Sequence, residues 1–243
     1  MIFFISDLHL APTTPGANAL FLDFLAGHAR SAGQLFILGD LFDAWPGDDV
    51  LDDPTTPLFA AIADALRKLT AAGTGVSLLH GNRDFLLGEA FARRSGGRLL
   101  PDPYILSLPS WQFVLSHGDA LCTGDQDYQR FRALVRSTGW QSDFLALPLA
   151  ERQAIAAGLR EKSASAKREK TVELMDVDPL TTDDFLRSNG YATLIHGHTH
   201  RPARHDHVVD GIHVERWVLA DWSEKRGECL CWNGERLVRQ SIP

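Results

Sequence analysis

Three histidines lie within five residues in the stretch 194–202, which reads LIHGHTHRP. Alternate side chains of an extended strand point to the same face, so histidines two positions apart can bind one metal ion. Histidine pairs also occur at the exposed ends of ordinary strands. This stretch alone therefore leaves a metal site and a surface strand end equally open.

Similar polar clusters follow other short β-rich runs. Strands are expected at residues 2–6, 35–38, 76–79, 113–116 and 192–195, and the clusters after them read DLH, GDLFD, HGNRD, HGD and HGHTH. Helix-like segments at 19–30 and 58–72 separate the first three runs, which predicts a βαβαβ opening with parallel strands. Ligands of open α/β sheets bind beyond the carboxyl ends of the strands, so we expect all five clusters at one edge.

The clusters offer carboxylate, amide and imidazole groups but no thiolate, a donor set that suits Mn²⁺, Fe²⁺, Co²⁺ or Zn²⁺. The candidate donors are Asp7, His9, Asp40, Asn82, His117, His198 and His200. Taken singly, Asp7 could cap a helix, Asn82 could occupy a turn and His117 could be a hydrogen-bonded core residue. Taken together, the donors favour a metal site.

Glycines adjoin most of these donors, at Gly39, Gly81, Gly118 and Gly197. Glycine adopts backbone conformations that a Cβ atom excludes. We therefore expect the four glycines to let the strand-end loops turn sharply enough for the donor side chains to converge.

The composition describes a globular chain without a broadly basic, nucleic-acid-binding surface. Its 243 residues are 44% hydrophobic and 23% charged, enough for one large core, and the net charge is −7. Three cysteines without zinc-finger spacing are interpreted as reduced packing residues. With no secretory leader and no apolar run of the roughly 18 residues that a transmembrane helix needs, we expect a cytosolic protein whose membrane contact is peripheral.

The ordered series DLH, GDLFD, GNRD, HGD and GHTH, from Asp7 to His200, closely resembles that of the calcineurin-like metallophosphoesterases. The resemblance implies an α/β fold, a four-layer α/β/β/α sandwich of two mixed sheets flanked by helices, with a dinuclear metal site. One ion would be held by Asp7, His9, Asp40 and His200, and the second by Asp40, Asn82, His117 and His198. Cations about 3.5–4 Å apart that share one carboxylate can activate a water and clamp phosphoryl oxygens, which makes Asp40 the central ligand.

Arg83 follows Asn82 at a position where many phosphoesterases of this type have a histidine that protonates the leaving alkoxide. Arginine is not a useful proton donor. A phosphate leaving group, whose second pKa is about 6, does not need one. The sequence GNRD therefore indicates cleavage of a pyrophosphate, with Arg83 stabilising charge on the phosphoryl oxygens.

Other polar residues of the clusters are interpreted as supporting groups. His80 and His196 precede glycines outside the ligand pattern, and each could orient a ligand or substrate or could be an ordinary surface or core histidine. Asp43, Asp84 and Asp119 are interpreted in the same way, as neighbours of the ligands and not as ligands.

The segment 120–191 is too long for an ordinary loop and needs secondary structure of its own. Apolar residues recur in it at helical spacing, so we expect a helical lid over residues 125–180, inserted within a single domain that spans residues 1–243. The stretch EKSASAKREK could be a solvated charged face, or its basic groups could bind a pyrophosphate. Similarly, Trp140, Phe144, Leu145 and Leu159 could line an acyl groove or pack between helices.

GNRD, the insertion and the phrase MDVDP together resemble the UDP-2,3-diacylglucosamine pyrophosphohydrolases of lipid A biosynthesis. The resemblance implies hydrolysis of UDP-2,3-diacylglucosamine to UMP and 2,3-diacylglucosamine 1-phosphate with two Mn²⁺ ions, by a monomer bound peripherally to the cytoplasmic face of the bacterial inner membrane. Catalysis would depend on Asp40, Asn82, Arg83, His117 and His198. The implied substrate contacts are Asn82, Arg83, Asp125, Ser163, Lys167, Lys170 and His198.

Two alternatives remain open at this point. The same scaffold could belong to a soluble nucleotide-sugar or dinucleotide pyrophosphatase or phosphodiesterase. It could also be a non-catalytic scaffold, although such a protein has no need for a complete ligand series together with Arg83. Hydrolysis of the acylated substrate, compared with unacylated UDP-sugars, separates the first alternative from the lipid A function.

Overall fold

The computed structural model describes residues 1–169 and 176–242, and for 162–169 it describes the course of a helix but not the side chains. Two β-sheets form the centre of the molecule. The first has the order β11-β10-β1-β2-β3-β4, made of β1 (Ile2–Ile5), β2 (Gln34–Leu38), β3 (Gly75–Leu79), β4 (Arg98–Leu99), β10 (Gly227–Trp232) and β11 (Leu237–Ile242). The second has the order β5-β6-β7-β9-β8, made of β5 (Tyr104–Leu108), β6 (Trp111–Leu115), β7 (Thr193–His196), β8 (Ala203–Val209) and β9 (Ile212–Val218).

The first three strands are parallel neighbours, as the βαβαβ pattern predicts. β1 pairs with β2 through Ile5 and Ile37, and β2 pairs with β3 through Leu38 and Leu79. In the second sheet, β6 and β7 are also parallel. Both sheets are mixed, because antiparallel pairs join β1 to β10 and β5 to β6.

Side chains of β1 alternate between two cores, as the period of a strand requires. Phe4 points into the core between the sheets, where it packs with Phe113 of β6 at a ring-centroid distance of 5.8 Å. Phe3 and Ile5 instead belong to the core between the first sheet and its helices. Because both faces of β1 are covered, the strand is apolar throughout, and this explains why its sequence shows no polar alternation.

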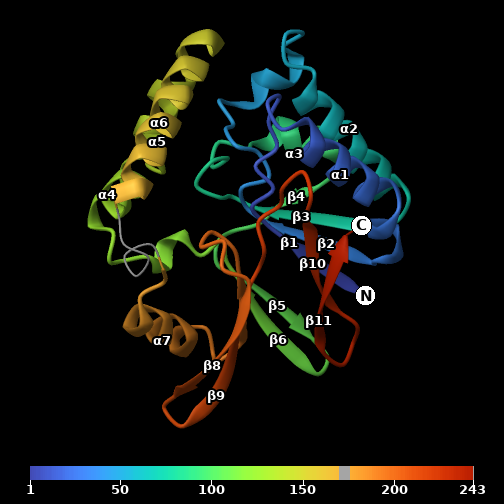
Figure 1. The fold of residues 1–243 in the computed structure, drawn as a ribbon, viewed down its shortest axis with the longest axis vertical. Coiled ribbons are helices and arrows are strands. Elements are labelled where there is room, and N and C mark those ends of the chain that lie inside the picture. The colour runs from blue at the N-terminus through green and yellow to red at the C-terminus, as the bar shows by residue number, and fades with distance from the viewer. Residues whose placement is uncertain (170–175, 243) are drawn as a thin grey trace.

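Helices cover the outer face of each sheet and complete a four-layer α/β/β/α sandwich, as expected (Figure 1). On the first sheet lie α1 (Pro15–Ala26), α2 (Leu58–Ala71) and α3 (Glu89–Ser95), and on the second lies α7 (Pro179–Ser188). Helix α2 buries Phe59, Ile62, Ala63, Leu66 and Leu69, the spacing of one helical face. The expected helix 19–30 begins earlier than predicted and ends at Ala26, because Pro15 suits a first helical turn and Gly27 follows the last residue.

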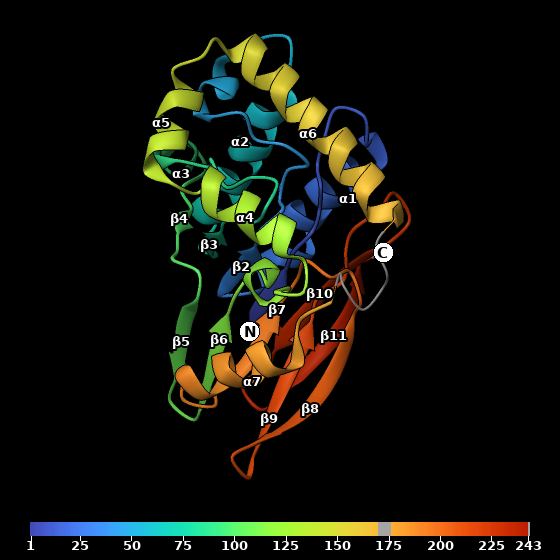
Figure 2. The same ribbon diagram turned by 90° about the vertical axis from the view of Figure 1, so that its left-hand side faces the viewer.

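The segment between β6 and β7 forms three further helices, α4 (Gln126–Val135), α5 (Thr138–Leu145) and α6 (Leu149–Glu169), before α7 begins. Figure 2 shows α4 and α6 on the side of the molecule that carries the strand-end loops. The buried side chain of Arg152 fastens α6 there by donating hydrogen bonds to the carbonyl of Pro46 at 2.6 Å and to Oδ1 of Asp49 at 2.9 Å. Among the described residues, no helix is long and apolar enough to span a bilayer.

Candidate metal centre and substrate cleft

Each proposed metal ligand lies just beyond the carboxyl end of a strand, namely β1, β2, β3, β6 or β7. Five of them adopt left-handed backbone angles that are uncommon outside glycine: Asp7, His9, Asp40, His198 and His200 have φ values of 55, 48, 52, 68 and 55°. Such conformations cost about 1–3 kcal/mol each and concentrate at functional sites. These backbone angles could not be read from the residue types, because they depend on how the surrounding loops fold.

The four expected glycines act in two different ways. Gly39 and Gly118 have positive φ values of 91 and 104°, as sharp turns require. At Gly81 and Gly197 the requirement is space, because a Cβ atom at Gly81 would collide with the carboxylate of Asp40, and one at Gly197 would collide with Ser6 and Asp7. These glycines let the loops approach the ligands closely.

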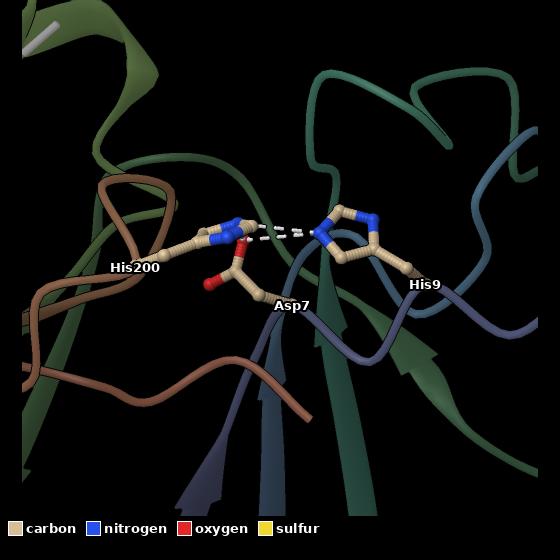
Figure 3. Close-up of side chains that lie close together, drawn as sticks. All are labelled: Asp7, His9 and His200. Carbon is tan, nitrogen blue, oxygen red and sulfur yellow. Dashed lines mark hydrogen bonds and ion pairs between the residues drawn. The ribbon is translucent and has the colours of Figure 1, made fainter. Parts of the chain in front are cut away.

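Asp7, His9 and His200 form the first group of donors (Figure 3). Nε2 of His200 lies 3.3 Å from Oδ1 of Asp7, and Nε2 of His9 lies 3.9 Å from the same oxygen. The two imidazole Nε2 atoms are 3.2 Å apart. Three donor atoms from two sheets therefore converge on one point.

Asp40, His117, Asn82 and His198 form the adjoining group. Nε2 of His117 lies 3.7 Å from Oδ1 of Asp40 and 3.0 Å from Oδ1 of Asn82, which in turn lies 2.8 Å from Nδ1 of His198. Nδ1 of His9 reaches to 3.8 Å from Oδ2 of Asp40. Asp40 thus faces donors of both groups, and Asp7 also lies within reach of Asp40 and His117.

Backbone hydrogen bonds hold the carboxylate of Asp7 and the loop of Asp40 in place. The main-chain N–H of His198 donates to Oδ2 of Asp7 at 2.9 Å and so joins the second sheet to the first. The buried carboxylate of Asp84 accepts hydrogen bonds from the main-chain N–H groups of Leu41 and Gly81, both at 2.8 Å, and of Asp40 at 3.2 Å. Asp84 therefore holds the loop that carries Asp40.

Charges are crowded in this buried cluster. Burial, with added repulsion from Asp84 and Asp7, raises the pKa of Asp40 to about 7 against the opposing effect of His117. Burial alone would lower the pKa of His117, but the carboxylates of Asp40, Asp7 and Asp119 raise it to about 9. For Asp7, burial is outweighed by His200, His117 and His9, which hold its pKa well below the usual range. A divalent cation stabilises such a set of carboxylates because its charge offsets their mutual repulsion.

The donor set fits a divalent metal ion. Oδ1 of Asp7 is buried and accepts no hydrogen bond from any described residue, although two imidazole nitrogens lie close to it. On the far side, Nδ1 of His117 is 2.9 Å from the carbonyl of Leu38, which leaves Nε2 directed into the cluster, where a bound cation would take the place of its proton. Carboxylate oxygens and imidazole nitrogens arranged in this way are typical of transition-metal sites.

A cavity of about 570 Å³ opens from the metal cluster and is lined there by Asn82, His198 and His200. The arginines that line it are Arg83, Arg132, Arg136, Arg160 and Arg201. Its apolar wall includes Phe85, Phe131, Trp140, Phe144 and Leu159, which come mostly from α4, α5 and α6. Metal-cluster residues, arginines and apolar side chains therefore line one cleft.

Three of the four candidate groove residues line this cavity, whereas Leu145 is 44% exposed and its Cδ2 lies against Gly47. Trp140 also stacks on Phe144 at a centroid distance of 4.7 Å. The two interpretations of these residues, groove lining and helix packing, are thus compatible for Trp140 and Phe144.

The predicted substrate contacts lie in different parts of this region. Arg83 lines the cavity, and Asp125 also lines it while its carboxylate caps α4 by accepting a hydrogen bond from the N–H of Tyr128 at 3.2 Å. Ser163 and Lys167 lie on α6, but their side chains are outside the described part of the structure. Lys170 lies wholly outside the described residues.

A hydrogen-bonded cluster of α4 side chains around Asp119 was not predicted from the sequence. Its buried Oδ2 accepts hydrogen bonds from the hydroxyl of Tyr128 and from Nε of Arg132, both at 2.7 Å. Arg136 donates to the carbonyl of Gly81 at 3.0 Å, and the ring of Tyr128 stacks against His198 at 5.9 Å. The positions 128, 132 and 136, four apart on one helix, were the available signal. Through them, α4 is attached directly to the ligand loops.

The supporting histidines differ in their surroundings. Nε2 of His80 lies 2.7 Å from the carbonyl of Leu87 and so joins the loop of Asn82 to the chain that leads into α3. His196 is fully buried, and burial together with the charge of Arg216 lowers its pKa to about 3. His196 is therefore neutral. Asp43 forms an ion pair with Arg160 across the cavity.

Two stacked mixed sheets, with carboxylates and imidazoles gathered at the carboxyl ends of their parallel strands, define a metal-dependent phosphoesterase. The chain belongs to the calcineurin-like phosphoesterases, whose family model matches residues 1–202.

Curated relatives are similar over nearly the whole chain. The UDP-2,3-diacylglucosamine hydrolase of Aromatoleum aromaticum is 53% identical over 231 residues, which cover 95% of this chain and 92% of the relative. The protein of the same name from Chromohalobacter salexigens is 47% identical, and the match covers 92% of this chain and 89% of that protein. The one from Aeromonas hydrophila is 46% identical, and the match covers 98% of this chain and 97% of that protein.

Proposed function

We propose that this protein hydrolyses the pyrophosphate bond of UDP-2,3-diacylglucosamine and releases UMP and 2,3-diacylglucosamine 1-phosphate, in lipid A biosynthesis. The observation that carries the proposal is the cleft of about 570 Å³, which is lined by residues of the metal cluster, by arginines and by large apolar side chains. A diphosphate with two acyl chains needs both kinds of lining. The names of the similar proteins support this substrate.

The polar residues of the cluster and the cleft divide the chemical work. Two Mn²⁺ ions, held by Asp7, His9, Asp40, Asn82, His117, His198 and His200, would supply Lewis acidity and an activated water for in-line attack on the α-phosphorus. Asn82 and His198 lie at the boundary between this cluster and the cleft, where they orient the phosphoryl group. Arg83 lines the same boundary and stabilises the charge that develops on the phosphoryl oxygens.

The leaving group accounts for the absence of a proton donor at position 83. A sugar 1-phosphate departs as a stable anion, so the reaction gains little from a general acid. Tyr128 does not supply one, because its hydroxyl donates to Asp119, and burial together with that carboxylate raises its pKa above the usual range. Electrostatic stabilisation is therefore the main contribution of the side chains.

The helices within residues 125–180 act as a lid that confers the lipid specificity. Trp140, Phe144 and Leu159 supply an apolar wall for the acyl chains, while Asp125, Ser163, Lys167 and Lys170 are proposed to bind the polar part of the substrate. The lid is attached to the catalytic loops through Asp119, so a substrate held by the lid is presented to the metal cluster.

Access to a lipid substrate calls for contact with the membrane that contains it. Large apolar side chains of α4, α5 and α6 are exposed, namely Phe131, Leu134, Leu145 and Ile155, with exposed fractions of 36, 55, 44 and 40%. Exposed apolar side chains on the lid favour peripheral binding to a bilayer. We place the protein on the cytoplasmic face of the bacterial inner membrane, where UDP-linked sugars are available.

Product analysis tests the reaction and the substrate together. Purified protein with Mn²⁺ and UDP-2,3-diacylglucosamine should yield UMP and the diacylated sugar 1-phosphate by mass spectrometry, and in heavy-oxygen water the label should enter UMP, since the α-phosphorus is attacked. An unacylated UDP-sugar is the matched control. Equal turnover of that control would favour a soluble nucleotide-sugar pyrophosphatase, and the absence of turnover with either diphosphate would favour a non-catalytic scaffold.

A further inference from the structure

Arg216 is a buried cation that lies behind the metal cluster. It lies on β9, where it pairs with Leu194 of the neighbouring β7, and only 7% of the residue is exposed. Its guanidinium contacts two imidazoles, with Nη1 3.1 Å from Nε2 of His196 and Nε 3.2 Å from Nε2 of His207. A buried arginine that binds two histidines is unusual, because neither partner offers a negative charge.

Hydrogen-bond chemistry determines how these histidines are protonated. A guanidinium only donates, so Nε2 of His196 and Nε2 of His207 must both accept. The remaining nitrogens each face an oxygen, since Nδ1 of His196 is 2.9 Å from the carbonyl of Gly197 and Nδ1 of His207 is 3.2 Å from Oδ1 of Asp183. Each ring therefore carries its proton on Nδ1. The N–H groups that Arg216, His196 and His207 direct at these partners then each have an acceptor.

These hydrogen bonds lead from Arg216 through His196 to the backbone of Gly197, which precedes the proposed ligands His198 and His200. Gly197 receives the hydrogen bond from His196, and its own N–H donates to the carbonyl of His117 at 3.0 Å. The next residue, His198, binds Asp7 through its N–H at 2.9 Å. No Cβ atom fits at Gly197, so the peptide has little room for another orientation. A shift of its carbonyl would move His198, His200 and the contact with Asp7 together.

Burial of the charged Arg216 side chain is electrostatically unfavourable. Burial lowers its pKa, and the carboxylate of Asp176 is the main group that opposes this effect. Asp176 in turn binds Arg201, the residue directly after His200, at 2.8 Å. A purely structural position would be served as well by an apolar side chain of similar volume.

We infer that Arg216 is a positioning residue for the metal centre, which holds His196 in the Nδ1–H tautomer and thereby fixes the Gly197 peptide and the loop of His198 and His200. The inference rests on the proposed metal site but not on the proposed substrate. It goes beyond the ligand pattern, because Arg216 touches neither metal donors nor cleft.

The wild-type protein provides the direct test. Two-bond proton–nitrogen correlation spectra of the histidine rings, with diamagnetic Zn²⁺ in place of Mn²⁺, should show both His196 and His207 protonated on Nδ1. A proton on Nε2 of His196, or on both of its nitrogens, would overturn the inference. This measurement needs no variant and does not depend on activity.

Variants then test the connection to the metal. Arg216→Met should weaken Zn²⁺ binding about 10- to 100-fold, the usual effect of losing a partner of a ligand, and should give a mixture of His196 tautomers. Arg216→Lys keeps the charge but replaces the planar guanidinium by a single ammonium group, so its Zn²⁺ affinity should lie between those of the wild type and Arg216→Met. With saturating Mn²⁺, kcat should fall while KM changes by less than about two-fold, because the cleft is untouched.

Arg204→Met is the matched control. Arg204 lies on the adjacent β8, is about half exposed, and pairs with Asp206 and Glu215 but with no imidazole. Its replacement should leave Zn²⁺ affinity and tautomers unchanged. If a folded Arg216→Lys or Arg216→Met protein binds Zn²⁺ as the wild type does, Arg216 has a structural role only. If the tautomers are as inferred but UDP-2,3-diacylglucosamine is not cleaved, the proposed function fails and the positioning role stands.

Discussion

The main-chain N–H of Arg83 donates a hydrogen bond of 2.8 Å to Oδ1 of Asp40, and Arg83 also lines the cleft. One residue therefore supports the central carboxylate through its backbone and forms part of the cleft wall, where we propose that its guanidinium meets the substrate. The two contributions are separable, because substitution of the side chain leaves the backbone donor in place. This relationship makes Arg83 suitable for testing transition-state stabilisation without loss of the metal site.

Arg83→Ala should lower kcat far more than it raises KM, by about 2–4 kcal/mol in the activation barrier, the range for losing one preorganised donor. Mn²⁺ content should stay at the wild-type level, because Asp40 keeps its backbone partner. Arg83→His should rescue little, since a phosphate leaving group gains little from an acid. Steady-state kinetics and elemental analysis provide the measurements. A histidine variant as active as the wild type would show that the leaving-group argument is wrong, and Arg93→Ala, on the exposed side of α3, is the control.

Asp40→Ala should remove nearly all turnover and lower the occupancy of both metal sites, because its carboxylate faces donors of both groups at 3.7 and 3.8 Å. The metal content of purified protein, measured by elemental analysis after dialysis against Mn²⁺, checks this. Asp64→Ala removes an exposed carboxylate that pairs with Arg94 and should keep full metal content. Near-normal metal content in the Asp40 variant would count against a shared ligand.

Gly197→Ala should abolish high-affinity metal binding although it adds one methyl group. That methyl would meet Ser6 and Asp7, with the Cβ of Ser6 at 2.9 Å, so the loop of His198 and His200 must move. Gly139→Ala is the control, since no atom lies within 4 Å of its added Cβ. Calorimetric titration with Mn²⁺ and thermal melting compare the two. Wild-type affinity in a folded Gly197 variant would show that the loop tolerates the displacement.

Trp140→Ala should reduce kcat/KM for the diacylated substrate at least about tenfold, or about 1.4 kcal/mol, because it removes part of the apolar wall of the cleft. Turnover of bis(p-nitrophenyl) phosphate should change by less than about two-fold, since a small ester needs no acyl groove. The control is Asp143→Ala, a change at an exposed position of the same helix that is not among the cleft-lining residues. Equal losses with both substrates would indicate general destabilisation, and lipid specificity would then not reside in this wall.

Much of the metal centre followed from the order of residues along the chain. Parallel strands place their carboxyl ends at one edge of a sheet, so polar residues after β1, β2 and β3 had to lie near one another. The GHTH and HGD clusters were expected there too, and the parallel pair β6–β7 brings them to the same edge. Local pattern was sufficient for these features because strand direction is encoded by the alternation of strand and helix.

Other features depended on contacts between residues far apart in sequence. Asp119 meets Arg132 and Tyr128 only after α4 folds back over the strand-end loops, and Arg216 meets His196 only because β9 lies beside β7. The left-handed backbone at Asp7 and Asp40 is likewise imposed by the loops that surround them.

The sequence by itself determined the family, the order of the metal donors and the expectation of a helical insertion. Only the tertiary structure decided that Asp7 as well as Asp40 lies between the two donor groups, that Trp140 lines the cleft while Leu145 is largely exposed, and that an arginine on β9 contacts His196. The physical reason is that donor identity and strand order are properties of local sequence, whereas the direction and partners of a side chain follow from packing among distant elements.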